Sequence, residues 1–353
     1  MISMEKAVRW FDSAQTPLHE LGMQADAVRK KWSGNAVYYN INAHINPTNV
    51  CQYRCALCAY SCDSDSPRAY RMELDEILQR AEDAEKAGCT EVHLVSGVDP
   101  RLPYGWYLEM VREIHRAFPT LLIKAFTAVE IAWMAEISGK SLQTVLAELQ
   151  GAGLKTLPGG GAEILVDSVR EKICARKPMS DVWLEVHRTA HRLGIPSTAT
   201  ILYGHLETWE ERVQHLFRLR ELQAETGGFL ALIPLAFHPS ATVLGKENAL
   251  RRTSAEEDLR MIAISRLILD NFPHIKAYWI SLGIGTAQTA LAYGADDLDG
   301  TVRQERIHHD AGSQTPQYLT VEELCQLIRE AGRRPVERDS LYHPVTRCQK
   351  EIS

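Results

Sequence analysis

The chain has 353 residues, of which 45% are hydrophobic and 24% charged, and its formal net charge is −6. These values are typical of a globular protein, and the length fits one large barrel or two smaller domains. The acidic balance argues against a nucleic-acid partner. The longest strongly apolar run, residues 229–237, is far shorter than the ~20 residues that a membrane helix needs. Because no apolar signal region begins the chain, we expect a cytoplasmic protein with no membrane partner.

Strand and helix patterns alternate along most of the chain. A first helix is expected over residues 17–32, with Gly34 ending it. Strands are expected at 37–46, 91–95, 121–126, 154–157, 197–203, 229–235, 275–281 and 295–301. Between them, helices are expected at 74–87, 105–118, 129–139, 141–151, 163–174, 181–193, 209–225, 256–271 and 286–293, and Ser141 is a plausible N-cap.

This alternation predicts the α/β class, because βα repeats require a parallel sheet. About eight repeats between residues 37 and 301 match the length of about 250 residues typical of a (β/α)8 TIM-type barrel. An open doubly wound sheet is the alternative. We predict an N-terminal helical cap (1–36), the barrel (37–310), and a C-terminal extension (311–353) whose helix, at 321–331, and polar tail pack on the barrel.

A short cysteine-rich loop follows the first expected strand. Cys51, Cys55 and Cys58 have the spacing C-x3-C-x2-C, and Cys62 follows four residues later. Iron–sulfur clusters are held by such thiolates, usually four of them, so three ligands would leave one iron of a 4Fe–4S cluster open. Two alternatives remain: a structural zinc site, although its cysteine pairs are usually further apart, and an electron carrier with Cys62 as the fourth ligand. The scattered cysteines are expected to be inert thiols; they are Cys89, Cys174, Cys325 and Cys348.

The polar and glycine-rich segments of the chain come where the expected strands end, and in a barrel the reacting groups come from these ends. The segment after 154–157 is Gly-Gly-Gly-Ala-Glu, and the segment after 229–235 contains His238. The triple glycine lacks the Lys-Ser/Thr of a phosphate-binding P-loop. We therefore expect the functional site at this end of the barrel.

The cysteine loop resembles the signature of the radical S-adenosylmethionine (SAM) enzymes. This resemblance implies that Cys51, Cys55 and Cys58 hold a 4Fe–4S cluster and that SAM chelates the open iron. It also implies SAM contacts at positions that match family motifs. These positions are Leu57 and Tyr60 in the loop, Gly97 after the second strand, Glu163 after the triple glycine, Arg176 as a partner for the SAM carboxylate, and Thr200, Gly204 and Glu207 in the fifth-strand motif. Thr200 stands where that motif has glycine, and Gly97 has no acid after it.

Downstream stretches resemble the menaquinone-pathway radical SAM enzymes, and among these the aminofutalosine synthases. The stretches include LPGGGAEIL, ATILYGHLET, LAFHP, KAYW and DDLDGT. This resemblance implies reductive cleavage of SAM, addition of the 5′-deoxyadenosyl radical to 3-[(1-carboxyvinyl)oxy]benzoate, aryl migration and decarboxylation to 6-amino-6-deoxyfutalosine. It further implies a flavodoxin or ferredoxin as reductant. The related dehypoxanthine futalosine cyclase, which abstracts hydrogen, is the nearest alternative.

The dicarboxylate substrate requires hydrogen-bond donors or cations at the barrel mouth. Basic side chains on or just after strands are His93, Lys124, His205, His238 and Lys276. From these and the remaining strand-end groups we predict His238, His205 and Asp299 as catalytic residues, and His93, Tyr278, Trp279 and Thr301 as substrate-binding residues. The two aromatic side chains could stack on the benzoate ring.

Overall fold

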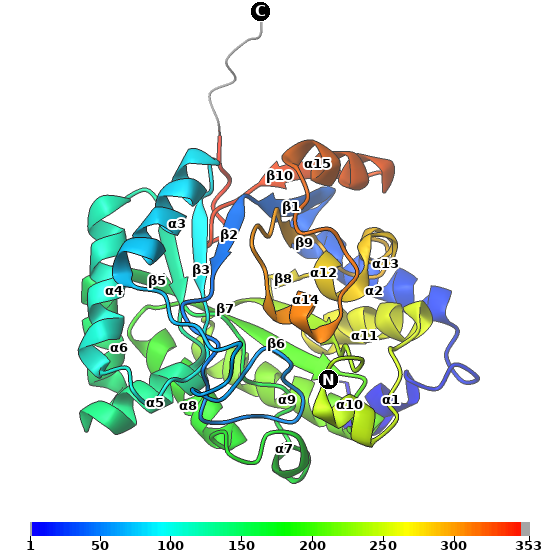
Figure 1. Ribbon diagram of the computed structural model, residues 1–353. Helices are drawn as coiled ribbons and strands as arrows, with labels where there is room; N and C mark the ends of the chain where they lie inside the picture. The colour runs from blue at the N-terminus through cyan, green and yellow to red at the C-terminus, as the bar shows by residue number, and fades with distance from the viewer. Residues whose placement is uncertain (1, 347–353) are drawn as a thin grey trace, which may run out of the picture.

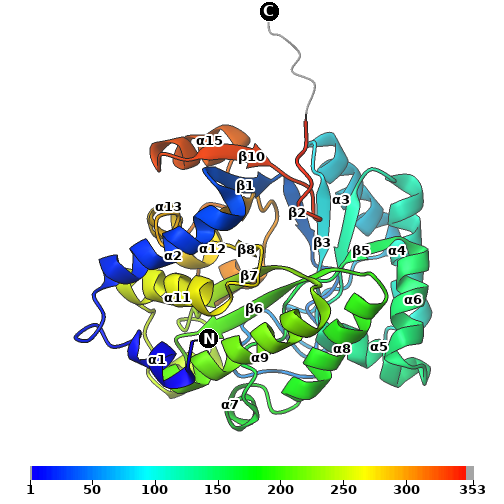
Figure 2. The ribbon, with the colours of Figure 1, turned by 180° about the vertical axis from the view of Figure 1, so that it is seen from behind.

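The computed structural model describes residues 2–346, and Cys348 and the end of the predicted C-terminal extension lie outside this range. Strands occupy the centre and helices surround them (Figures 1 and 2). The strands are β1 (Ala36–Asn40), β2 (Asn42–Ile45), β3 (Glu91–Leu94), β4 (Leu122–Ala125), β5 (Leu154–Thr156), β6 (Ser197–Tyr203), β7 (Phe229–Ala236), β8 (His274–Ile275), β9 (Asp297–Gly300) and β10 (Arg334–Glu337).

Most helices lie where the alternation predicts them, and several short helices are added. They are α1 (Met4–Arg9), α2 (Leu18–Ser33), α3 (Leu74–Lys86), α4 (Tyr104–Ala117), α5 (Ala128–Ser138), α6 (Leu142–Ala152), α7 (Asp167–Ile173), α8 (Ser180–Arg192), α9 (Trp209–Thr226), α10 (Val243–Glu247), α11 (Ala255–Ile268), α12 (Trp279–Leu282), α13 (Ile284–Ala290), α14 (Ile307–Ala311) and α15 (Val321–Glu330). The predicted N-cap is confirmed, since the Ser141 hydroxyl accepts from the Thr144 N–H. Among the described helices, none has the length and apolar character needed to cross a membrane.

The strands follow one another in a parallel ring. The sheet β2-β3-β4-β5 and the sheet β6-β7-β8 are joined by a bridge between Leu157 and Ser197. A bridge between Lys276 and Asp297 joins the end of β8 to β9, and β9 pairs with β1. This order confirms the predicted TIM-type barrel, with β1 and β2 together in the first position.

The expected first strand, residues 37–46, is split in two. β1 pairs with β9 and β10, whereas β2 pairs with β3, and Ile41 separates them. The register of the β1–β9 pair shifts between Tyr38 and Asn40. Such irregularities let one chain segment change neighbours, which alternation in the sequence alone does not reveal.

Two further predicted elements are wrong in extent. The apolar run 275–281 is a strand only in its first residue, because Tyr278 is the N-cap of α12. Short apolar runs do not distinguish a buried strand from a buried helix. The helix predicted for 163–174 begins at Asp167, because Glu163 has a left-handed φ of 47°, which a right-handed helix does not accommodate.

The terminal segments pack on the outside of the barrel. Figure 2 shows α2 lying along α11, and the Trp32 indole N–H donates to the Asp270 carbonyl. The polar tail forms a strand, β10, which pairs in parallel with β1. The sequence did not indicate this strand, because Pro335 and its charged neighbours are atypical of a strand interior and are tolerated at an edge.

Candidate active site

A cavity of about 280 Å³ lies inside the barrel and reaches the loops at the carboxyl ends of its strands. It brings together many of the predicted site residues from distant parts of the chain. These are Cys51, Cys55, Leu57, Cys58, Tyr60, His93, Gly97, Glu163, Thr200, His238, Tyr278 and Asp299. In a parallel barrel, functional groups come from this end of the strands.

The cysteine loop is held in shape by its own backbone and by its neighbours. The Cys51 N–H donates to the Cys62 carbonyl at 3.1 Å, and the Cys62 N–H donates to the Asn49 carbonyl at 2.9 Å. The Ala56 N–H donates to the Ile173 carbonyl, and the Tyr60 hydroxyl donates to the Thr48 carbonyl at 3.0 Å. The loop is therefore pre-formed around the three cysteines that line the cavity.

The donor set fits a 4Fe–4S cluster with three protein ligands. Cys51, Cys55 and Cys58 line the same cavity, whereas Cys62 is 2% exposed and is not part of its wall. Burial raises the pKa of the Cys55 thiol to about 12, against the opposing effect of the Lys177 ammonium. In the described part of the chain, no three His, Cys, Asp or Glu side chains are grouped to hold a metal ion. Three cysteines spread around one cavity suit a multi-iron cluster.

Gly97 and Gly159 let backbone segments approach closely around the cavity. A Cβ atom on Gly97 would lie 2.2 Å from the Val50 carbonyl oxygen, directly before the cysteine loop. A Cβ atom on Gly159 would lie 2.5 Å from the Ala199 carbonyl carbon, and the Thr200 hydroxyl donates to the Gly159 carbonyl at 2.7 Å. Both glycines thus set the shape of the wall that supports the predicted SAM site.

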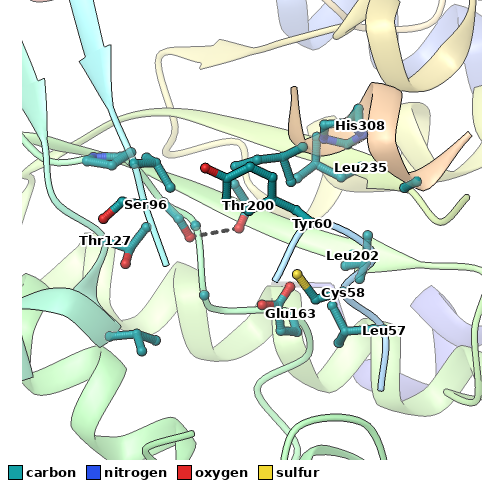
Figure 3. Close-up of a pocket in the computed structure, with 18 of the residues that line it drawn as sticks. Leu57, Cys58, Tyr60, Ser96, Thr127, Glu163, Thr200, Leu202, Leu235 and His308 are labelled. Atoms are coloured by element: carbon teal, nitrogen blue, oxygen red, sulfur yellow. Dashed lines mark hydrogen bonds between the residues drawn. The ribbon is translucent and has the colours of Figure 1, made fainter. Parts of the chain in front are cut away.

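A buried ion pair lies beside the cysteines. The Lys177 ammonium donates to the Glu163 carboxylate, and both side chains line the cavity. Figure 3 shows Glu163 close to Cys58 and Leu57, while Ser96 and Thr127 lie on another side of the cavity. Arg176, predicted to meet the SAM carboxylate, is exposed and outside the cavity wall. The sequence alone could not show that the adjacent Lys177, and not Arg176, lines the cavity.

Glu130 is a cavity residue that was not among the predicted site residues. Its carboxylate accepts from the Ser96 N–H at 3.1 Å and from the Thr127 N–H at 2.8 Å, and it completes the capping box of α5. Burial raises its pKa to about 7, although these hydrogen bonds oppose the shift. The only sequence pattern that points to Glu130 is the capping box Thr-x-x-Glu, which indicates the start of a helix more often than a functional site.

One wall of the cavity carries His238, Tyr278 and His308. The His238 Nε2–H donates to the Ser281 carbonyl at 3.0 Å, which leaves Nδ1 as an acceptor. Burial, followed by His308 and Arg252, lowers the pKa of His238 to about 4, so its ring is neutral at pH 7. The ring centroids of Tyr278 and His308 are 5.3 Å apart. His238 therefore offers the cavity a neutral acceptor.

Replacing His238 with Ala should lower turnover about tenfold or more, the effect of losing one well-placed hydrogen bond. Steady-state kinetics with saturating SAM measure it. Because the ring is neutral, the effect should be the same at pH 6.5 and pH 8. His19→Ala, on an exposed face of α2, is the matched control and should leave turnover unchanged. Unchanged turnover in the His238 variant would remove this residue from the site.

Five other predicted residues lie outside the cavity wall and have structural contacts. Glu207 accepts from the Gly204 N–H at 2.6 Å and from Arg212 Nε at 2.7 Å. Burial alone would raise the pKa of Glu207, but His205 and Arg212 hold it at about 2. The remaining contacts are the His205 Nε2–H to the Leu202 carbonyl, the Trp279 indole N–H to the Gly300 carbonyl, and the Thr301 hydroxyl to the Asn42 carbonyl. These residues brace the strand ends; their predicted roles remain predictions.

Comparisons with known proteins agree with this geometry. A family model described as the radical SAM superfamily matches residues 45–219, and one described as the CofH/MqnC C-terminal region matches residues 226–351. Aminodeoxyfutalosine synthase of Thermus thermophilus is 46% identical over 91% of this chain and 87% of that protein. A 5-amino-6-(D-ribitylamino)uracil–L-tyrosine 4-hydroxyphenyl transferase of Methanopyrus kandleri is 40% identical over 91% of this chain and 88% of that protein.

The fold has a counterpart among solved structures. The crystal structure of methylornithine synthase (PylB) aligns with a TM-score of 0.74 over 95% of this chain and 94% of that chain, at 19% identity. The barrel, the three-cysteine loop and the family matches together confirm the resemblance noted in the sequence. The chain belongs to the radical SAM superfamily, enzymes that use a 4Fe–4S cluster and SAM, in the branch with the CofH/MqnC C-terminal region.

Proposed function

We propose that this enzyme is an aminodeoxyfutalosine synthase of menaquinone biosynthesis. The observation that carries the proposal is the 46% identity, over 91% of the chain, to the Thermus enzyme of that name. The substrates would be SAM and 3-[(1-carboxyvinyl)oxy]benzoate, and the products 6-amino-6-deoxyfutalosine, methionine and bicarbonate. A flavodoxin or ferredoxin would supply the electron.

The bound cluster would supply the electron that cleaves SAM to methionine and a 5′-deoxyadenosyl radical. We assign Cys51, Cys55 and Cys58 to hold it, because all three line the cavity. Leu57 and Leu202 give this part of the wall an apolar surface, and Glu163 with Lys177 adds a polar pair beside it. Such a mixture suits a nucleoside with a charged amino-acid tail.

The rest of the wall would hold the aromatic substrate and exclude water. Ile233, Leu235 and Phe237 form an apolar stretch along β7 and just after it. An adenosyl radical reacts with most C–H bonds, so its partner must be held in contact and in one orientation. A mainly apolar cavity inside the barrel supports this requirement, with few polar groups to fix the ends of the substrate.

The test is incubation of the reduced, anaerobically reconstituted enzyme with SAM and 3-[(1-carboxyvinyl)oxy]benzoate, followed by mass spectrometry. We expect 6-amino-6-deoxyfutalosine, with one methionine per product. Free 5′-deoxyadenosine without adenosylated product would contradict the proposal and favour a hydrogen-abstracting enzyme such as the cyclase.

The second candidate is a tyrosine 4-hydroxyphenyl transferase, which the 40% identity to the Methanopyrus protein favours. The same preparation is therefore incubated with SAM, L-tyrosine and 5-amino-6-(D-ribitylamino)uracil. We expect no coupled product. A coupled product from this pair, and none from the enol ether, would establish the second candidate instead.

A further inference from the structure

Three inward-facing side chains form a row across neighbouring strands of the barrel. His44 on β2 is in register with His93 on β3, and His93 is in register with Lys124 on β4. Each stands one residue before the end of its strand, and all three line the cavity. Because side chains alternate along a strand, this shared register places the three on the same inner face, as one layer of the barrel.

The two imidazoles of the row have ring nitrogens without protein partners. Their ring centroids are 4.6 Å apart, and the Nε2 atoms of His44 and His93 are buried without a hydrogen-bond partner among the described residues. Burial lowers the pKa of both rings, so they are neutral at pH 7. A buried, unpartnered polar atom in a native protein calls for an explanation such as a bound ligand.

Lys124 is a buried cation that has no carboxylate within hydrogen-bond distance among the described residues. It is 4% exposed, and its nearest carboxylate oxygen in the described chain is Glu91 Oε1 at 4.0 Å, beyond hydrogen-bond reach. Burial lowers its pKa to about 8, with Glu91 acting in the opposite direction, so the ammonium form prevails at neutral pH. The neighbouring acids have closer partners, since Lys276 donates to Asp299 at 2.7 Å.

The other cation nearby is also engaged. Arg338 Nε donates to Asp297 at 2.6 Å, and Ser340 donates to Glu91. The ammonium of Lys124, with three donor hydrogens, is therefore left for the cavity. With the two imidazoles it gives up to three donor side chains in one row, which suits the two oxygens of a carboxylate.

We propose that the row His44, His93 and Lys124 binds the aryl carboxylate of the substrate. This inference rests on the proposed function, which supplies a substrate with two carboxylates. The enol carboxylate adjoins the carbon atoms that react, so it must lie near SAM and the cysteine loop, which follows the strand ends. The ring separates the aryl carboxylate, which is meta to the ether oxygen, from these carbon atoms, and the row lies on the strands, before the cysteine loop in the chain and deeper in the barrel. The row thus fixes the ring and orients the enol ether toward SAM.

The test measures binding of 3-hydroxybenzoate, a probe that has the aryl carboxylate but no enol ether. Equilibrium dialysis is performed on the anaerobically reconstituted enzyme without SAM. Lys124→Met should raise the Kd about tenfold to a hundredfold, the usual effect of losing a charge-assisted hydrogen bond. Lys155→Met, at an exposed position on the adjacent strand β5, is the control and should bind as the wild type does.

Phenol, which lacks the carboxylate, should bind with the same Kd to all three proteins, and this result also shows that the Lys124 variant is folded. A second pair of variants tests the row independently. His93→Leu should weaken 3-hydroxybenzoate binding, and His93→Gln, which keeps an N–H donor, should restore part of it. Equal binding of 3-hydroxybenzoate to wild type and Lys124→Met, or no preference of the wild type for it over phenol, would overturn the inference.

Product formation on the same preparations separates this inference from the proposed function. Binding of 3-hydroxybenzoate that depends on Lys124, without adenosylated product from the enol ether, would refute the function and retain the carboxylate site. Adenosylated product with binding that is independent of Lys124 would retain the function and refute the carboxylate site.

Discussion

Replacing Cys51, Cys55 or Cys58 with Ala should abolish cluster binding and all measurable product formation. Each thiolate is assigned to a different iron, and two protein ligands cannot retain a 4Fe–4S cluster that normally has four. The three side chains line one cavity in a loop that its backbone holds in shape. The measurements are iron and sulfide content after anaerobic reconstitution, the visible absorption of the cluster, and product formation.

Cys62→Ala is the matched control for these variants, since it removes a thiol from the same loop. Cys62 is 2% exposed, outside the cavity wall, and joined to the loop through its backbone. Its replacement should leave iron content and turnover within about twofold of wild type, because a small buried side chain costs mainly packing energy, of order 1 kcal/mol. Loss of iron from the Cys62 variant would mean that Cys62 is a ligand, as in an electron carrier.

Asp299→Asn should destabilise the apoprotein by about 3–5 kcal/mol, the usual cost of leaving a buried charge unpaired. Lys276 donates to Asp299 at 2.7 Å, and Arg338 lies 3.6 Å from the same oxygen. Burial alone would raise the pKa of Asp299, but Lys276 and the neighbouring cations hold it below its ordinary value. The carboxylate is therefore ionised. Replacing it with a neutral amide removes one of the negative charges that balance the buried cations Lys276 and Arg338.

Asparagine is the suitable replacement, because Asp299 has a φ of 69°. Asn tolerates this left-handed conformation, whereas Ala would add backbone strain to the effect of lost charge. The measurement is the free energy of unfolding in urea, with fluorescence and circular dichroism followed together. Asp270→Asn, which breaks a partly exposed pair with Arg220, is the control and should cost no more than about 1 kcal/mol. A loss below that level for Asp299→Asn would show that its ion pairs do not support the barrel.

The sequence predicted the barrel and its cysteine loop because both depend on patterns along the chain. Alternating βα units require a parallel sheet, and C-x3-C-x2-C is a local spacing. Thr200 and Glu163 both line the cavity: Thr200 lies within β6, and Glu163 follows β5 after the triple glycine. β10 was not predicted, since its pairing with β1 depends on a contact across most of the chain.

Side-chain direction is what the sequence could not supply. Arg176 and Lys177 are adjacent, and only Lys177 faces the cavity. Tyr278 and Trp279 were expected side by side on a strand, but a turn into α12 brings only Tyr278 to the cavity wall. Lys124 was noted as a basic residue on a strand, but its inward direction and its distance from Glu91 follow only from the closed barrel.

The central claim is that three cysteines hold a cluster with one iron open to SAM. Electron paramagnetic resonance of the reduced, anaerobically reconstituted enzyme, recorded with and without SAM, tests it most directly. The claim predicts the signal of a reduced 4Fe–4S cluster, with about four iron atoms per chain, whose shape changes when SAM is added. A cluster signal that SAM leaves unchanged, in a protein that loses the cluster when Cys62 is replaced, would contradict it.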